Sequence, residues 1–285
     1  MKQIQWFPGH MAIAKRLIEE KLPLVDIVFC LIDARIPIAS QNPLLQGIIK
    51  DKPTLFLLNK ADLADESQNQ KWVFSFEKQG IPALAVNSLT GNPIKQVVDK
   101  SKAILKNVFE KEHKRGMTER PIRAMVIGIP NVGKSQFINK LSGKNKVKTG
   151  DKPGVTKMQV FLKAANELEL LDNPGVLWPK IESKDAAIYL ALIGSIKEDI
   201  LPIDEICLFG IDFLIHNYPK GLSERYSLEN VKEKTALEVL DEIGIRRGCI
   251  SKGNEIDYER VFKLFLYDFR NMAFGRITIE HAEDV

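Results

Sequence analysis

The sequence predicts an α/β domain followed by a smaller, all-helical domain. In the first part of the chain, short apolar runs alternate with stretches of helical periodicity. Such runs are typical of strands that are buried on both faces of a parallel sheet. Beyond about residue 178, helical patterns continue with little strand signal. We therefore expect residues 1–180 to form the α/β domain and residues 181–285 to form the helical domain.

Each expected element rests on its own stretch of sequence. The first strand is the clearest, because residues 24–34 are an almost unbroken apolar run. The expected strands are residues 24–34, 54–58, 83–86, 122–128, 159–161 and 167–171. The expected helices are residues 11–21, 42–50, 66–79, 93–111, 136–141, 185–196, 203–215, 235–243 and 255–274. The polar stretch 111–120 is expected to be a surface connector.

The composition is that of a folded protein. Hydrophobic residues make up 45% and charged residues 27% of the 285 residues, which excludes a fully disordered chain. The net charge of +4 permits an RNA partner without requiring one. No apolar run reaches the ~20 residues of a membrane span, and no signal-peptide pattern is present, so we expect a cytoplasmic protein without a membrane partner. Cys30, Cys207 and Cys249 have no metal-ligand or disulfide spacing, and we expect them to be buried.

A phosphate-binding loop follows the strand at 122–128. The motif Gly128-x-x-x-x-Gly133-Lys134-Ser135 stands between a strand and a helix, which is the context that it requires. Its glycines let backbone N–H groups turn toward phosphates, and Lys134 adds a positive charge near the β- and γ-phosphates. The Ser135 hydroxyl is a ligand for Mg²⁺ in such loops. The loop residues that we expect to contact the nucleotide are Asn131, Val132, Gly133, Lys134 and Ser135.

Two further segments are candidates for sensing the γ-phosphate. Asp172 follows the last expected strand and can bind Mg²⁺ through water, while the N–H of Gly175 can reach the γ-phosphate. Thr156 is the candidate switch threonine, whose hydroxyl joins Mg²⁺ only when the γ-phosphate is present. Ordinary turns and Pro-Gly loops contain the same residues, so these assignments rest on their distance downstream of the phosphate loop.

A second motif, Asn59-Lys60-Ala61-Asp62, distinguishes guanine from adenine. The Asp62 carboxylate can accept hydrogen bonds from guanine N1–H and from the 2-amino group, whereas adenine would leave it unpaired. Asn59 is expected to brace the loop, and the stem of Lys60 is expected to lie over the face of the base. After the next strand, Asn87 and Ser88 are expected to offer a backbone N–H to guanine O6.

These motifs occur in a circularly permuted order. The base motif precedes the phosphate loop, although in an ordinary GTPase the phosphate loop comes first. The same sheet can still form, because domain termini often lie close together and can be joined. The predicted fold is therefore α/β, a circularly permuted P-loop GTPase domain with a smaller all-helical C-terminal domain.

The permuted order also predicts a catalytic arrangement. Val176 occupies the position of the usual catalytic Gln, and Val cannot orient a water molecule. The N-terminal helix fills the place beside the switch, so its first residues should lie near the γ-phosphate. We hypothesise that His10 positions or activates the attacking water; the alternative is that His10 starts the helix or contacts RNA. The catalytic candidates are His10, Lys134 and Thr156.

The chain resembles the YlqF/RbgA family of circularly permuted bacterial GTPases. The resemblance lies in the permuted order and in three strings: Trp6-Phe7-Pro8-Gly9-His10-Met11, Asp33-Ala34-Arg35-Ile36-Pro37, and Asp172-Asn173-Pro174-Gly175-Val176-Leu177-Trp178-Pro179. The family assists late assembly of the large ribosomal subunit, binds its RNA, and hydrolyses GTP faster on the ribosomal particle. The resemblance thus implies GTP or GDP and Mg²⁺ as cofactors, and a large-subunit precursor with its ribosomal RNA as partner. With Asn131 in its phosphate loop, the chain also resembles GTPases that use a bound K⁺.

The residues themselves support RNA binding less strongly. The last quarter of the chain contains a basic set with interleaved aromatic residues, and the alternative is a solvated face over a helix core. The basic residues are Arg246, Arg247, Lys252, Arg260, Lys263, Arg270 and Arg276, and the aromatic ones are Phe262, Phe265 and Tyr267. We expect a monomeric assembly factor with a low intrinsic GTPase rate. The alternative is a switch that responds to GTP occupancy, acts on a protein partner and hydrolyses little.

Overall fold

The computed structural model divides the chain into two compact units. It describes residues 8–89, 93–143, 161–164, 167–172, 175–177, 181, 183–196 and 202–284. The boundary between the units falls between Ile181 and Glu182, and the second unit ends at Ile279. The residues from Glu280 onward belong to the first unit, although the sequence placed them in the helical domain.

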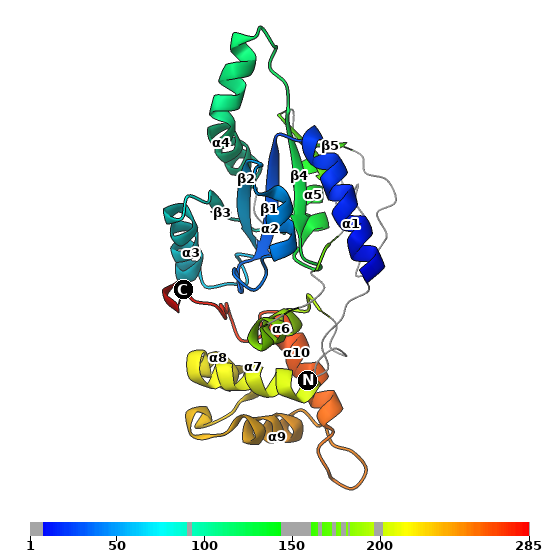
Figure 1. The fold of residues 1–285 in the computed structure, drawn as a ribbon. Coiled ribbons are helices and arrows are strands. Elements are labelled where there is room, and N and C mark those ends of the chain that lie inside the picture. The colour runs from blue at the N-terminus through cyan, green and yellow to red at the C-terminus, as the bar shows by residue number, and fades with distance from the viewer. Residues whose placement is uncertain are drawn as a thin grey trace. The chain divides into compact units, whose positions relative to one another are not determined.

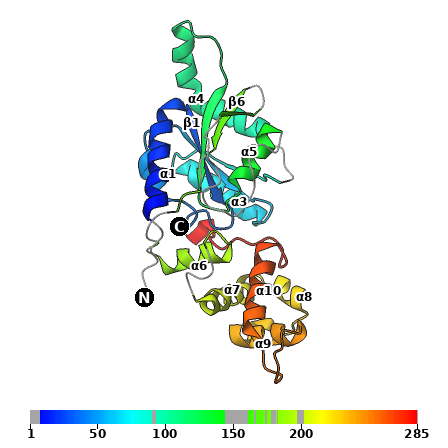
Figure 2. The same ribbon diagram turned by 90° about the vertical axis from the view of Figure 1, so that its right-hand side faces the viewer.

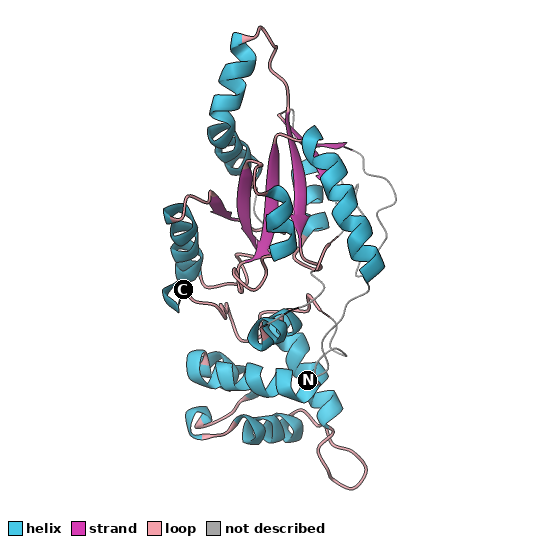
Figure 3. Cartoon of the chain, in the orientation of Figure 1, coloured by secondary structure: helices cyan, strands magenta, loops and turns pink. Residues whose placement is uncertain are grey.

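The first unit is built around a six-stranded sheet in the order β3-β2-β1-β4-β6-β5 (Figure 3). All neighbouring strands are parallel except β5 and β6, which are antiparallel. The strands are β1 (Ile27–Asp33), β2 (Thr54–Asn59), β3 (Ala83–Ala85), β4 (Ile122–Gly128), β5 (Phe161–Ala164) and β6 (Leu168–Asp172). The alternation of apolar runs with helical stretches therefore produced the expected α/β sheet.

Helices cover both faces of this sheet (Figures 1 and 2). They are α1 (Pro8–Lys21), α2 (Pro43–Ile49), α3 (Glu66–Lys78), α4 (Ile94–Lys114) and α5 (Lys134–Ser142), with a short 3₁₀ turn, η1 (Leu22–Leu24), before β1. On one face, Cys30 and Phe56 share a buried apolar cluster with Ile18 of α1 and Phe76 of α3. On the other face, Phe29 packs edge-to-face against Phe137 of α5, with ring centroids 6.3 Å apart.

The second unit is helical. Its helices are α6 (Lys184–Leu192), α7 (Ile203–Asn217), α8 (Pro219–Tyr226), α9 (Ala236–Arg246) and α10 (Tyr258–Arg270), with a 3₁₀ turn η3 (Val231–Glu233). A 3₁₀ turn η4 (Ala282–Asp284) ends the described chain in the first unit. Thr235 caps α9 with the reciprocal hydrogen bonds of a capping box to Glu238. Asp268 on α10 is buried and accepts hydrogen bonds from the Arg225 guanidinium and the Tyr226 hydroxyl of α8.

Several expected boundaries are wrong. The first is the connector, because α4 continues to Lys114 and Arg120 is tied down by ion pairs to Asp26 and Glu112. The strand expected at 159–161 is β5, Phe161–Ala164, and its beginning lies at the edge of the described residues. Helix α8 was not expected from the sequence at all.

Two expectations about composition can be compared with the structure. Cys30, Cys207 and Cys249 are free and buried, as expected. Burial raises the pKa of the Cys30 thiol to about 12, which makes it inert at neutral pH. Among the described residues, no helix is both long enough and apolar enough to cross a membrane.

Candidate nucleotide site

The candidate site lies at the carboxyl ends of the central strands. β1 is flanked by β2 on one side and β4 on the other, and the chain reaches these two neighbours through separate crossovers. Parallel sheets bind ligands at such a point, in the crevice beyond the strand ends. The base motif begins at the end of β2 and the phosphate loop begins at the end of β4. The permuted sequence therefore brings both motifs to the same edge.

The phosphate loop has the backbone geometry that the motif requires. Gly133 is the N-cap of α5 and adopts φ +97°, in the left-handed region that favours glycine. A Cβ added at Gly133 would lie 2.4 Å from Nδ2 of Asn59, so no larger residue fits there. Asn131 is also left-handed, with φ +57°. Ser135 is the second residue of α5, and the N-terminus of that helix favours an anion.

Lys134 is buried against its own loop. Its ammonium donates hydrogen bonds to the carbonyl oxygens of Gly128 (3.1 Å) and Ile129 (2.8 Å). A Cβ on Gly175 would approach Lys134 Nζ to 2.9 Å and Pro130 Cα to 3.0 Å. The structure therefore brings the predicted γ-phosphate sensor Gly175 against the phosphate loop, and only a glycine fits at that approach.

Asp172 is the last residue of β6, and it pairs in register with Val126 on β4. Val126 stands two residues before Gly128, so the backbone of Asp172 lies beside the start of the phosphate loop. Thr156, the candidate switch threonine, lies outside the described residues.

Asn59 links the base motif to the phosphate loop. Its Nδ2 donates to the carbonyl oxygen of Val132 at 2.8 Å, and its Oδ1 accepts from the Ser88 hydroxyl at 2.6 Å. Asn59 is 1% exposed, so both hydrogen bonds are shielded from water. One side chain therefore joins the ends of β2 and β3 to the loop after β4. The base motif predicts that Asn59 braces the loop, but its sequence does not identify Val132 and Ser88 as the partners of Asn59.

The Asp62 carboxylate is partly exposed at this edge. Its charge acts on the ammonium of Lys60, two residues before it in the base motif. Asn87 accepts a hydrogen bond from the Leu89 N–H at 2.8 Å, which closes the turn that carries Ser88. A backbone N–H of this turn is the group that we expect to face guanine O6.

Lys60 is held by a buried carboxylate that the motif reading missed. Its Nζ lies 3.0 Å from Oδ2 of Asp33, which is fully buried at the end of β1. Arg35 binds the same carboxylate through Nε and Nη2, both at 2.9 Å. Burial by itself would raise the pKa of Asp33, but the charges of Arg35 and Lys60 hold it well below its usual range. From the sequence, Asp33 and Arg35 were noted only as part of a string that resembles the family, and no role was predicted for them.

The proximity of the first turn of α1 to the γ-phosphate stays a prediction. In Figures 1 and 2 the first turn of α1 is level with the carboxyl ends of the strands. His10 belongs to this turn by backbone, and the positions of its side-chain atoms lie outside the described structure. Val176 is 2% exposed, and its carbonyl oxygen accepts a hydrogen bond from Asn42 at 2.7 Å. An apolar, buried side chain thus occupies the position of the usual catalytic Gln.

Comparisons with known proteins identify the family. A model of the 50S ribosome-binding GTPase family matches residues 123–245. Ribosome biogenesis GTPase A of Bacillus licheniformis is 49% identical over 282 residues, which cover 99% of each chain. The protein of the same name from Thermotoga maritima is 33% identical over 283 residues, covering 99% of this chain and 96% of that one. The chain belongs to the ribosome biogenesis GTPase A (YlqF/RbgA) family.

Solved structures of this family support the fold. The GNP-bound YlqF from T. maritima matches with a TM-score of 0.68 and 30% identity, over 96% of this chain and 100% of that chain. The GDP-bound form matches with a TM-score of 0.69 and 29% identity, over 94% of this chain and 100% of that one. As a member of the family, the chain is a circularly permuted GTPase that binds guanine nucleotides and hydrolyses GTP.

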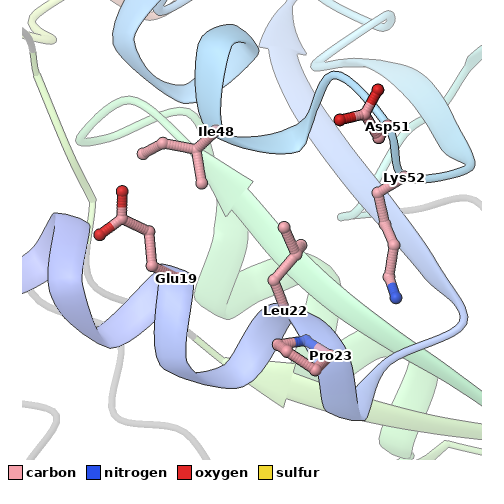
Figure 4. Close-up of a pocket in the computed structure, with 6 residues that line it drawn as sticks. All are labelled: Glu19, Leu22, Pro23, Ile48, Asp51 and Lys52. Carbon is pink, nitrogen blue, oxygen red and sulfur yellow. The ribbon is translucent and has the colours of Figure 1, made fainter.

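A pocket elsewhere on the first unit does not belong to this site. It has a volume of about 250 Å³ and lies between the end of α1 and the end of α2 (Figure 4). Its walls include Leu22 and Pro23, which precede β1, and Lys52, which precedes β2. These residues lie at the amino ends of the strands, whereas the phosphate loop lies at their carboxyl ends.

Proposed function

We propose that this protein is a GTP-hydrolysing assembly factor for the large ribosomal subunit. In this proposal it binds ribosomal RNA or pre-ribosomal particles, and GTP hydrolysis switches its affinity for them. The observation that carries the nucleotide part is the Asn59 bridge, which joins the base loop to the phosphate loop through Val132 and Ser88. The partner is inferred from the family, because the similar proteins are named as ribosome biogenesis GTPases.

Each part of the site has a role in this proposal. Asn131, Val132 and Gly133 direct backbone N–H groups to the phosphates. Lys134 exchanges its two backbone carbonyl partners for β- and γ-phosphate oxygens, which removes it from Gly128 and Ile129. The carboxylate of Asp62 pairs with guanine, and the stem of Lys60, fixed at its end by Asp33, lies against the base.

Mg²⁺ fits this site as an ion held mainly by the nucleotide. Among the described residues, no group of three or more His, Cys, Asp or Glu is arranged to hold a metal. Mg²⁺ usually keeps several waters and takes one or two protein oxygens together with phosphates. We propose Ser135, Asp172 and, in the GTP state, Thr156 as the protein ligands. K⁺ near Asn131 is a further proposal that rests on the family resemblance.

Hydrolysis by the protein alone should be slow. The buried Val176 cannot orient water, and we propose that His10 supplies this function from the first turn of α1. A ribosomal particle that brought His10 against the attacking water would raise the rate. GTP turnover would then depend on arrival of the protein at the particle.

The second unit is the proposed RNA-binding domain. Arg246, Arg260 and Lys263 are exposed on or near α9 and α10, where they can reach phosphates. Arg270 has a structural role instead, because it donates to the carbonyl oxygens of Ala191 and Leu192. Phe265 is buried in the core, as the alternative reading of the aromatic residues expected.

The experiment is GTP turnover measured with and without purified large ribosomal subunits. We expect the rate to rise at least about tenfold on the particle, and Lys134→Ala, which removes the phosphate contact, to abolish both rates. A switch that hydrolyses little, or a GTPase that acts on another protein, would show the same rate in both conditions. Small ribosomal subunits serve as the matched control particle.

A further inference from the structure

The chain returns to the first unit at its C-terminal end. We call residues 280–284 the C-terminal strap. The N–H of Glu280 donates to the carbonyl oxygen of Arg35 at 3.3 Å, and the N–H of Ala282 donates to Oε1 of Gln68 at 3.1 Å. These contacts lay the strap across the loop after β1 and across α3.

Glu280 is the centre of the strap. Its Oε2 accepts from the N–H groups of Ile38 at 2.6 Å and Ala39 at 3.1 Å, and Oε1 accepts from Ala39 at 3.0 Å. Its carbonyl oxygen accepts from Nε1 of Trp72, on α3, at 2.7 Å. Trp72 is fully buried, so this bond has a fixed direction. A single residue therefore ties the loop after β1 to α3.

The two segments that Glu280 joins are those that hold the base loop. The loop after β1 carries Arg35, which clamps the Asp33 carboxylate that binds Lys60. Helix α3 carries Asn69, whose Nδ2 donates to the carbonyl oxygen of Ala61 at 2.9 Å. Lys60 and Ala61 are consecutive residues of the base motif. The contacts therefore form a closed circuit that runs from the loop after β1 through the base loop to α3, and the strap joins its two ends.

We propose that Glu280 is a positioning residue for guanine recognition, which holds the base loop so that Asp62 meets the base in register. This inference rests on the proposed function, because it needs guanine to bind at Asp62. Glu280 acts by preorganisation: a base loop that is already fixed loses less freedom when the nucleotide binds. Removal of the circuit's last link should therefore weaken the nucleotide's contacts to the base more than its contacts to the phosphates.

Three variants and two nucleotides test the proposal. IDP lacks the 2-amino group of GDP, so the ratio of their dissociation constants reports the second hydrogen bond to Asp62. Glu280→Ala should raise the Kd for GDP about tenfold and lower the GDP preference over IDP. Glu280→Gln should have a smaller effect than Glu280→Ala, because its amide oxygen at the Oε2 position still accepts from both backbone N–H groups, although its NH₂ group then faces the Ala39 N–H. Glu283→Gln, an exposed residue of the same strap that pairs with Lys71, is the matched control and should change neither value.

The outcomes separate the inference from the proposed function. A folded Glu280→Ala protein with the wild-type Kd for GDP and the wild-type preference over IDP would overturn the inference. A lower melting temperature with unchanged nucleotide ratios would also overturn it, because that result indicates an anchor for the chain end only. A wild-type protein that binds ADP as tightly as GDP would overturn the proposed guanine site, and the inference with it.

A second measurement on the wild type covers the case in which Glu280→Ala does not fold. Hydrogen exchange of peptides spanning residues 35–40 and 280–284 should slow when GDP binds. Inorganic triphosphate, which can fill only the phosphate loop, should leave these peptides unchanged. Equal exchange of both peptides with and without GDP would contradict a link between the strap and the base loop.

Discussion

Asn59 and Asp33 show how single side chains unite segments that are far apart in sequence. Asn59 reaches the phosphate loop 73 residues later, and Asp33 holds Lys60 across two strand ends. Motif chemistry predicted that Asn59 and Lys60 belong to a base site, because these residue types suit that task. It could not predict Asp33 and Arg35, since a buried ion pair depends on three-dimensional neighbours that no spacing reveals.

The role of His10 is a prediction at this scale. His10→Ala should lower the GTP hydrolysis rate by about 10²–10⁴-fold, as expected for loss of a group that orients or activates water. The Kd values for GTP and GDP should stay within about twofold, because Asp62 and Lys134 remain. Single-turnover hydrolysis and equilibrium nucleotide binding measure the two quantities. His113→Ala changes an exposed histidine on α4 and serves as the control; unchanged turnover in His10→Ala would exclude the proposed role.

Glu280 predicts a pH dependence of stability. Burial raises the pKa of Glu280 to about 7, although the N–H donors of Ile38 and Ala39 lower it. The folded carboxyl then holds its proton more tightly than the unfolded one, so this stabilisation is present at low pH and is lost as pH rises from about 4.5 through about 7. Urea unfolding between pH 5 and 8 should show a loss of order 1–3 kcal/mol in the wild type that is smaller in Glu280→Gln. Parallel pH profiles for the two proteins would contradict this assignment.

Among the helices and strands, the hydrophobic pattern predicted those elements whose side chains are extensively buried. β1 was predictable because both its faces are buried, and β4 begins and ends at the expected residues. α8 was missed because it is short, begins with Pro219 and has a polar sequence, and its stability comes from packing by Leu222 and Tyr226. β5 ends three residues later than expected, because a short edge strand has little pattern of its own.

The ion pair between α8 and α10 carries a prediction for the second unit. Asp268→Asn leaves the Arg225 guanidinium and the Tyr226 hydroxyl with a weaker partner in a mostly buried position. We expect a loss of about 2 kcal/mol in the local stability of these helices. Native-state hydrogen exchange of α8 and α10 measures it. Glu259→Gln removes an exposed pair with Lys263 and should have little effect; equal exchange in both variants would show that Asp268 contributes nothing.

For the whole molecule, the order of motifs determined the architecture. Moving the base motif ahead of the phosphate loop leaves the sheet intact, because β1 still lies between β2 and β4. The sequence therefore predicted the fold and the meeting of the base motif with the phosphate loop at one edge of the sheet. It did not predict the return of residues 280–284 to the first unit, because this short segment has no periodic pattern and is held by polar contacts to residues that are far away in the sequence.

The central claim is that the permuted motifs assemble one site for guanine nucleotides, and exchange of the base tests it most directly. Xanthine carries a carbonyl oxygen where guanine has its 2-amino group, so an amide at position 62 can donate to it. Equilibrium titration of the wild type should show GDP preferred over XDP by at least about 100-fold, and Asp62→Asn should reverse that preference. A wild type that does not distinguish the two nucleotides, or an Asp62→Asn protein with unchanged preference, would contradict the claim.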